Sequence, residues 1–113
     1  MQEKVGQEFG FMRLDVYRAA RELVVLVQLA AIRDSELREQ ASRAAKSAFL
    51  NLAEGLPSSS LPMRRKFFSC ARGSAAEVAA ALDLSAALGV ASAEHARRII
   101  GLAARLSAML SRL

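Results

Sequence analysis

The side chains best suited to catalysis are a single histidine, His95, and a single cysteine, Cys70. A thiol–imidazole pair would need both residues in one cleft, with a third group orienting the imidazole. Cys70 lies in the apolar stretch 67–71, which predicts a buried and inert thiol. His95 follows Glu94 in the first turn of an expected helix, which predicts an exposed side chain. We therefore expect that the protein is not an enzyme and has no catalytic residues.

Motifs for metals and nucleotides are also absent from the sequence. One cysteine cannot build a Cys-based zinc site, and there is no Glu-x-x-His pair of the kind that forms di-iron sites in helical bundles. Neither Gly-x-x-x-x-Gly-Lys-Ser/Thr nor Gly-x-Gly-x-x-Gly occurs. The sequence therefore predicts no metal site and no cofactor.

Basic residues have a clearer chemistry, because Lys and Arg neutralise phosphates with little sequence preference. The chain carries 16 Lys and Arg against 11 Asp and Glu, for a formal net charge of +5. The basic residues of segment 38–72, where they are concentrated, are the candidates for RNA or DNA contact: Arg38, Arg43, Lys46, Arg64, Arg65, Lys66 and Arg72. The alternative is a solvated basic face without a ligand, and charge alone does not separate the two interpretations.

The aromatic residues could serve either as a platform for base stacking or as core. They are Phe9, Phe11, Tyr17, Phe49, Phe67 and Phe68. Stacking on aromatic rings is how many proteins hold unpaired bases. Five of the six fall on or beside apolar stripes, so we interpret most of them as core residues.

A polar stripe follows one face of the expected second helix. Its members step by three or four residues: Gln40, Arg43, Ser47, Asn51 and Glu54. Against an antiparallel third helix, Glu54 would pair with Arg64 or Arg65. Arg43 would pair with Glu77 in the same way. The stripe is therefore either a structural network, which we favour, or a polar surface for a partner.

Apolar periodicity predicts four helices to position these groups. The expected helices are Phe11–Ile32, a second capped by Asp34 and Ser35 that runs to Glu54, a third from Leu61 or Pro62 to Gly89, and a fourth capped by Ser92. Gly55 and Gly89 are expected in the left-handed conformation that ends helices. The expected core stripes are Val16, Ala20, Leu23, Val27 and Ala30; Leu37, Ala41, Ala44, Ala48 and Leu52; Phe67, Ala71, Ser74, Val78, Leu82 and Ser85; and Ile99, Leu102, Leu106, Met109 and Leu113.

The predicted fold class is all-α, an antiparallel up-down-up-down four-helix bundle. The chain has 113 residues with only 2 Pro and 6 Gly, which fits one helical domain, and its connections are short. We expect a partly ordered N-terminal tail over residues 1–10 and a single domain over residues 11–113. The longest uncharged apolar stretch, 23–32, is too short to span a bilayer, and the N-terminus has no apolar signal core. We therefore expect a cytoplasmic protein without a membrane contact.

Two features favour assembly of the bundle into a ring-like homo-oligomer. The first helix is apolar on more than one side, which predicts burial on more than one side. Gly73 and Gly101 lie inside helices among small residues, and we interpret them as points where two helices approach closely.

The order and spacing of several motifs resemble a known family. The motifs are Phe11-x-x-Leu14-x-Val16-Tyr17, Leu37-Arg38-Glu39-Gln40, Arg43-Ala44-Ala45-x-Ser47, Asn51-Leu52-Ala53-Glu54-Gly55, Phe67-Phe68 and Ala71-Arg72-Gly73-Ser74-x-x-Glu77-Val78. They resemble the four-helix-bundle proteins encoded in intervening sequences of bacterial 23S ribosomal RNA genes. That family is similar in turn to the accessory variability determinant proteins of diversity-generating retroelements. The resemblance covers residues 11–89, and the last expected helix matches only in pattern.

The resemblance implies a homopentameric barrel of antiparallel bundles, often with a basic surface. The retroelement relatives bind nucleic acid and a reverse transcriptase. Residues carried over as family signatures are Gln40, Arg43, Ser47, Asn51, Glu54, Gly55, Arg72, Gly73, Ser74 and Glu77. We expect a non-enzymatic oligomer that binds RNA or DNA through its basic face. The alternative is an adaptor or scaffold ring that docks a protein such as a reverse transcriptase.

Overall fold

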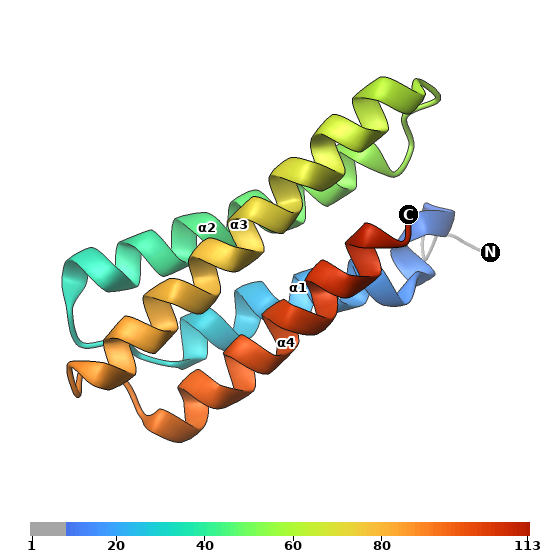
Figure 1. The fold of residues 1–113 in the computed structure, drawn as a ribbon. Coiled ribbons are helices and arrows are strands. Elements are labelled where there is room, and N and C mark those ends of the chain that lie inside the picture. Colours follow the sequence, from blue (N-terminus) through green and yellow to red (C-terminus); the bar gives the residue numbers. More distant parts are fainter. Residues whose placement is uncertain (1–8) are drawn as a thin grey trace.

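The computed structural model describes residues 9–113, and over this range the protein is all-α with no strand. A short 3-10 helix, η1 (Gly10–Arg13), precedes four α-helices. They are α1 (Asp15–Leu29), α2 (Ser35–Gly55), α3 (Leu61–Ala87) and α4 (Ala93–Ser111), shown in Figure 1. The prediction of four helices is confirmed. Most of the expected N-terminal tail, residues 1–8, lies outside the described residues.

Side-chain caps at three helix starts explain why the helices begin where they do. The carboxylate of Asp34 accepts a hydrogen bond from the Leu37 backbone N–H at 2.9 Å. The hydroxyl of Ser92 accepts from the His95 N–H at 3.1 Å, and both caps were predicted. Ser60 caps α3 in the same manner, directly before the predicted start at Leu61. Each cap satisfies a backbone donor that the helix itself leaves unpaired.

Helix ends agree with the sequence less well than helix starts. Gly89 follows α3 with φ +74°, as predicted. Gly55, in contrast, is the last residue of α2, and its φ is not positive, so the predicted left-handed end is wrong there. The first helix stops at Leu29 and not at Ile32, because Ala31 takes a left-handed φ of +51°. It also begins late, since Leu14 is extended and separates η1 from α1.

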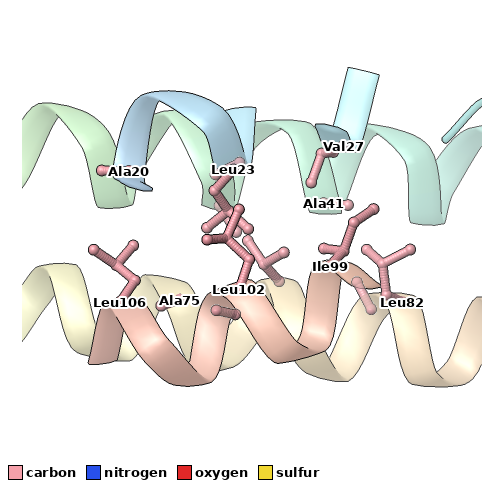
Figure 2. Packing of buried hydrophobic residues seen from close by; sticks show 14 of the residues in the cluster. Ala20, Leu23, Val27, Ala41, Ala75, Leu82, Ile99, Leu102 and Leu106 are labelled. Carbon is pink, nitrogen blue, oxygen red and sulfur yellow. The ribbon is translucent and has the colours of Figure 1, made fainter. Parts of the chain in front are cut away.

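The four helices enclose one apolar core. The backbones of α2 and α3, α3 and α4, α1 and α2, and α1 and α4 run close together, so each helix has two neighbours and α2 is not a neighbour of α4. Figure 2 shows side chains from all four helices meeting in this core, among them Leu23, Ala41, Leu82 and Leu102. All five residues of the predicted α1 stripe are buried. The core is rich in alanine along α2 and α3, which lets these two helices pack over most of their length.

Four positions of the predicted core differ in the structure. On α2, Leu37 is only partly buried. On α3 the buried phenylalanine is Phe68 and not Phe67, which is half-buried. On α4 the stripe ends with buried Leu110, whereas Leu113 is 49% exposed and Met109 only partly buried. Leu37, Met109 and Leu113 lie near helix ends, and Phe67 lies two turns into α3; at each position a shift of one residue moves a side chain across the border between core and solvent.

Neither internal glycine marks a close approach of helices within the chain. A Cβ built on Gly73 meets no atom of the described residues within 4 Å, and one on Gly101 meets only the Arg105 side chain at 4.0 Å. Neither glycine is therefore a contact point within the bundle, and a close approach to another copy of the chain stays a prediction. No helix among the described residues is long and apolar enough to cross a membrane.

Candidate nucleic-acid interface

A groove of about 670 Å³ lies beside the end of α1 and the first half of α2. The groove-lining residues are Val27, Gln28, Ser35, Glu36, Arg38, Glu39, Ser42, Arg43 and Lys46. Three of the predicted nucleic-acid-binding residues, Arg38, Arg43 and Lys46, therefore lie together. We call this surface the α1–α2 groove.

Charge is distributed unevenly along the α1–α2 groove. Its acidic residues, Glu36 and Glu39, lie in the first turns of α2, where the helix dipole favours negative charge. Arg38 lies among them, and its guanidinium donates to the Ile32 carbonyl at 2.9 Å. Arg43 and Lys46 lie one to two turns further along α2, beyond the last acidic lining residue. The positive end of the groove is thus the end towards the middle of α2.

Arg64, in contrast, is committed to the α2–α3 connection. Its Nη1 donates to the carbonyl oxygens of Leu56 at 2.6 Å, Gly55 at 3.2 Å and Ser58 at 3.4 Å. The guanidinium also lies 5.1 Å from the centroid of the Phe68 ring. The predicted Glu54 pairing is wrong, because no hydrogen bond among residues 9–113 joins Glu54 to Arg64 or Arg65, and the carbonyls at the end of α2 take its place.

The remaining predicted basic residues lie outside the α1–α2 groove. Arg65 and Lys66 are exposed on the first turns of α3, and Arg72 is half-buried further along the same helix. The structure therefore divides the seven candidates into a set of three in the groove, an exposed pair on α3, Arg72, and Arg64 in a structural role.

The polar stripe of α2 is structural at its centre. The hydroxyls of Ser47 and Ser74 are 2.9 Å apart and join α2 to α3. Asn51 donates to the Ser47 carbonyl at 2.9 Å and to its hydroxyl at 3.2 Å. The predicted bond between Arg43 and Glu77 is not formed among the described residues; Arg43 lines the α1–α2 groove. Other signature residues are exposed: Gln40, Glu54, Gly73 and Glu77.

Four aromatic rings form a continuous series at one end of α1. Phe9 and Phe11 stack with centroids 5.4 Å apart and planes 7° apart. Phe11 contacts Tyr17 at 5.8 Å, and Tyr17 contacts Phe49 of α2 at 5.1 Å, both in tilted geometry. We call these four residues the aromatic ladder. Tyr17 and Phe49 also pack against the core, as predicted, but Phe9 is 72% exposed.

The residues considered for catalysis lie on the surface. Cys70 is exposed, so the prediction of a buried thiol is wrong. It precedes the buried Ala71 by one residue, which turns its side chain about 100° around α3, to the edge of the buried face. His95 is exposed, as predicted. No group of three or more potential metal ligands occurs in the described part of the chain.

Sequence reasoning missed the α1 side of this surface. Gln28 lines the α1–α2 groove, and Tyr17 belongs to the aromatic ladder. Arg21 is exposed and lies on the same α1 face between them, because residues 17, 21, 24 and 28 recur at helical spacing. That spacing is visible in the sequence, but Tyr17 was considered only as a stacking or core aromatic, and the polar Arg21 and Gln28 were not considered at all.

Comparison with protein families gives one match. The model of the family described as 23S rRNA-intervening sequence protein matches residues 12–112, nearly the whole chain. No curated protein shows significant sequence similarity to the chain.

Proposed function

Because the chain belongs to the family of 23S rRNA-intervening sequence proteins, we propose that it is a non-enzymatic, oligomeric protein that binds RNA or DNA through phosphate contacts. The observation that carries this proposal is the α1–α2 groove, in which Arg38, Arg43 and Lys46 converge. The exposed pair Arg65 and Lys66 adds positive charge on α3. The family description links these proteins to ribosomal RNA genes, which makes RNA a natural first ligand to test.

The chemistry of this interface is charge neutralisation. Each Lys or Arg that neutralises a phosphate releases condensed counterions, so affinity falls steeply as salt rises. Phosphate contacts alone carry no sequence information, so binding is expected to depend little on sequence.

The proposed assembly is an up-down-up-down bundle that forms a ring, with five subunits implied by the resemblance. Antiparallel packing of α2 and α3 is supported by the order of the contacts along the two helices. Ser47 bonds to Ser74, and Gly55 lies against Phe68, so positions increase on α2 as they decrease on α3. Exposed apolar side chains on α1, with Val25 at 48% and Leu29 at 66%, support contact with another copy.

The direct test is fluorescence anisotropy with a labelled structured RNA and a matched DNA, at about 50 and 200 mM salt. We expect tight binding at low salt and a steep loss at higher salt. Arg43→Ala with Lys46→Ala should weaken binding to every sequence and make the log–log salt slope shallower by roughly 1.5. Arg65→Ala with Lys66→Ala measures the α3 contribution. Arg64 is left intact because it holds the α2–α3 connection.

The matched control is Arg97→Ala with Arg98→Ala. It removes the same charge from exposed positions of α4, which does not contact α2. Equal weakening by the control would assign binding to net charge and not to the groove. Absence of binding to either nucleic acid at low salt would refute the proposal.

The second candidate function is an adaptor that docks a protein such as a reverse transcriptase. The exposed apolar residues of α1 favour it, since they offer a surface that phosphate binding does not use. A pulldown that recovers one protein after nuclease treatment, and loses it in Leu29→Asp, would support the adaptor function.

In the anisotropy assay, a difference in affinity between the RNA and the matched DNA would show whether the 2′-hydroxyl or the helix shape contributes to binding.

A further inference from the structure

The aromatic ladder begins where the positive end of the α1–α2 groove stops. On α2, Lys46 lines the groove and Phe49 follows three residues later, a rise of about 4.5 Å. Residues 39, 42, 46 and 49 recur at helical spacing, so Phe49 continues the groove-lining face of the helix. On α1, the corresponding face runs from Gln28 through Arg21 to Tyr17. The groove and the aromatic ladder therefore form one continuous surface between two helices.

The outer end of the aromatic ladder is unusual for rings that serve only as core. Phe9 is 72% exposed, although a ring of this size normally gains most by burial. Its plane is nearly parallel to that of Phe11, at 7°, whereas the inner contacts of the ladder are tilted by 60° and 56°. A parallel pair at an exposed end is the geometry that a flat aromatic base can extend by stacking.

We propose that this surface binds a single-stranded segment of nucleic acid, with phosphates at Arg43 and Lys46 and unpaired bases stacked on the aromatic ladder. The inference rests on the proposed function and adds the strandedness of the ligand. In a duplex the bases are stacked on one another and their faces are not accessible to Phe9 or Phe11. In a single strand every base has a free face, so stacking is tolerant of sequence.

The test compares the affinity of the protein for a labelled single-stranded RNA of about twelve nucleotides with its affinity for the same sequence in a blunt-ended duplex. The comparison is then repeated with single-stranded and double-stranded DNA. We expect the single strand to bind more tightly than the duplex. Phe9→Ala should weaken single-strand binding about five- to 150-fold, the range for loss of one stacked base. Duplex binding should change by less than about two-fold, because its phosphate contacts remain. Phe9→Trp should restore single-strand affinity, since it keeps a flat aromatic face.

A matched control separates stacking from general loss of apolar surface. Leu88→Ala removes a side chain that is 59% exposed at the turn after α3, and it should leave both affinities unchanged. Phe9 is a suitable site because it contributes little to the core, so its variants should unfold at the same denaturant concentration as the parent protein.

The chain also contains its own optical probe. It has one tyrosine and no tryptophan, so intrinsic emission comes from Tyr17, inside the aromatic ladder. Single-strand binding should quench this emission in the parent protein and more weakly in Phe9→Ala. Equal affinity for both strand forms, with no effect of Phe9→Ala, would overturn the inference while leaving phosphate binding intact. Loss of all binding at low salt would refute the proposed function itself.

Discussion

The turns after α2 and α3 each involve a glycine, but for different reasons: Gly55 is the last residue of α2, and Gly89 lies within the turn after α3. Gly89 has φ +74°, and a Cβ built on it meets no described atom within 4 Å. Gly55 is helical, and its Cβ would lie 2.7 Å from Cε1 of Phe68 and 3.0 Å from Cβ of Phe67. Position 89 therefore requires glycine because its φ is positive. Position 55 requires glycine because a Cβ there would clash with Phe67 and Phe68.

The two turns also satisfy their carbonyl groups differently. After α3, the Val90 N–H donates to the Ser85 carbonyl and the Gly89 N–H to the Ala86 carbonyl, the two bonds of a Schellman motif. After α2, the guanidinium of Arg64 reaches the carbonyls of Gly55 and Leu56 from the next helix. The α3 turn is closed by these two backbone bonds, and the Arg33 guanidinium adds a bond to the Gly89 carbonyl at 2.6 Å. The α2 turn has one backbone bond, from the Ser58 N–H to the Gly55 carbonyl at 3.2 Å, and Arg64 supplies its shortest bond, to Leu56 at 2.6 Å.

The largest effect that would test this contrast is expected from Arg64→Ala. The substitution leaves carbonyls at the end of α2 without a charged donor and removes the contact with Phe68. We expect a loss of about 2 kcal/mol in the free energy of unfolding, in the range for hydrogen bonds to charged groups. Urea denaturation followed by circular dichroism measures it. Arg65→Ala, an exposed neighbour, should change stability by less than about 0.5 kcal/mol. Similar values for the two variants would remove the distinction between the turns.

Gly55→Ala is expected to have the next largest effect. Alanine favours a helix by about 1 kcal/mol, but overpacking costs about 1–3 kcal/mol. The overpacking should dominate, because Phe68 is only 4% exposed and has little space to move. We expect a net loss of up to about 2 kcal/mol, measured by urea denaturation. Adding Phe68→Leu should make the cost of Gly55→Ala smaller than in the parent background. A stabilised Gly55→Ala variant would show that Gly55 is not limited by space.

The smallest effects are expected at the two left-handed residues. Gly89→Ala should cost about 1 kcal/mol, because an L-residue is strained at that φ. Ala31, at φ +51°, already carries this strain after α1, so Ala31→Gly should stabilise the protein by about 0.5 kcal/mol. Thermal denaturation of both variants should move the melting temperature in opposite directions. If both variants shifted the melting temperature in the same direction, left-handed backbone strain could not explain both effects.

The sequence predicts well those features that depend on residues close together along the chain. The caps at Asp34 and Ser92 depend on a side chain and a backbone three residues away, and both are confirmed. The wrong predictions depend on distant contacts. Gly55 was predicted from helix-end statistics, but its environment is set by Phe68 on another helix. Cys70 has apolar sequence neighbours, yet the rotation of α3 places it on the exposed side.

The candidate interface was predicted in part for the same reason. Charge density along the chain identified Arg38, Arg43 and Lys46, which converge. It also identified Arg64, whose role is set by the carbonyls that it reaches across the α2–α3 connection. The aromatic ladder joins residues 9 and 11 to residue 49, and no local pattern reports that pairing. Its members were therefore assigned to the core one by one.

The exposed position of Cys70 offers a way to test the proposed ring and to count its subunits. It is the only cysteine of the chain and lies on the surface, so a maleimide or nitroxide attaches at one defined place without any substitution. In a closed ring, such labels occupy the corners of a regular polygon. The ratio of the distances to the nearest and next-nearest label then depends only on the number of corners. Pulsed electron paramagnetic resonance on the unaltered sequence would thus count the subunits of a ring.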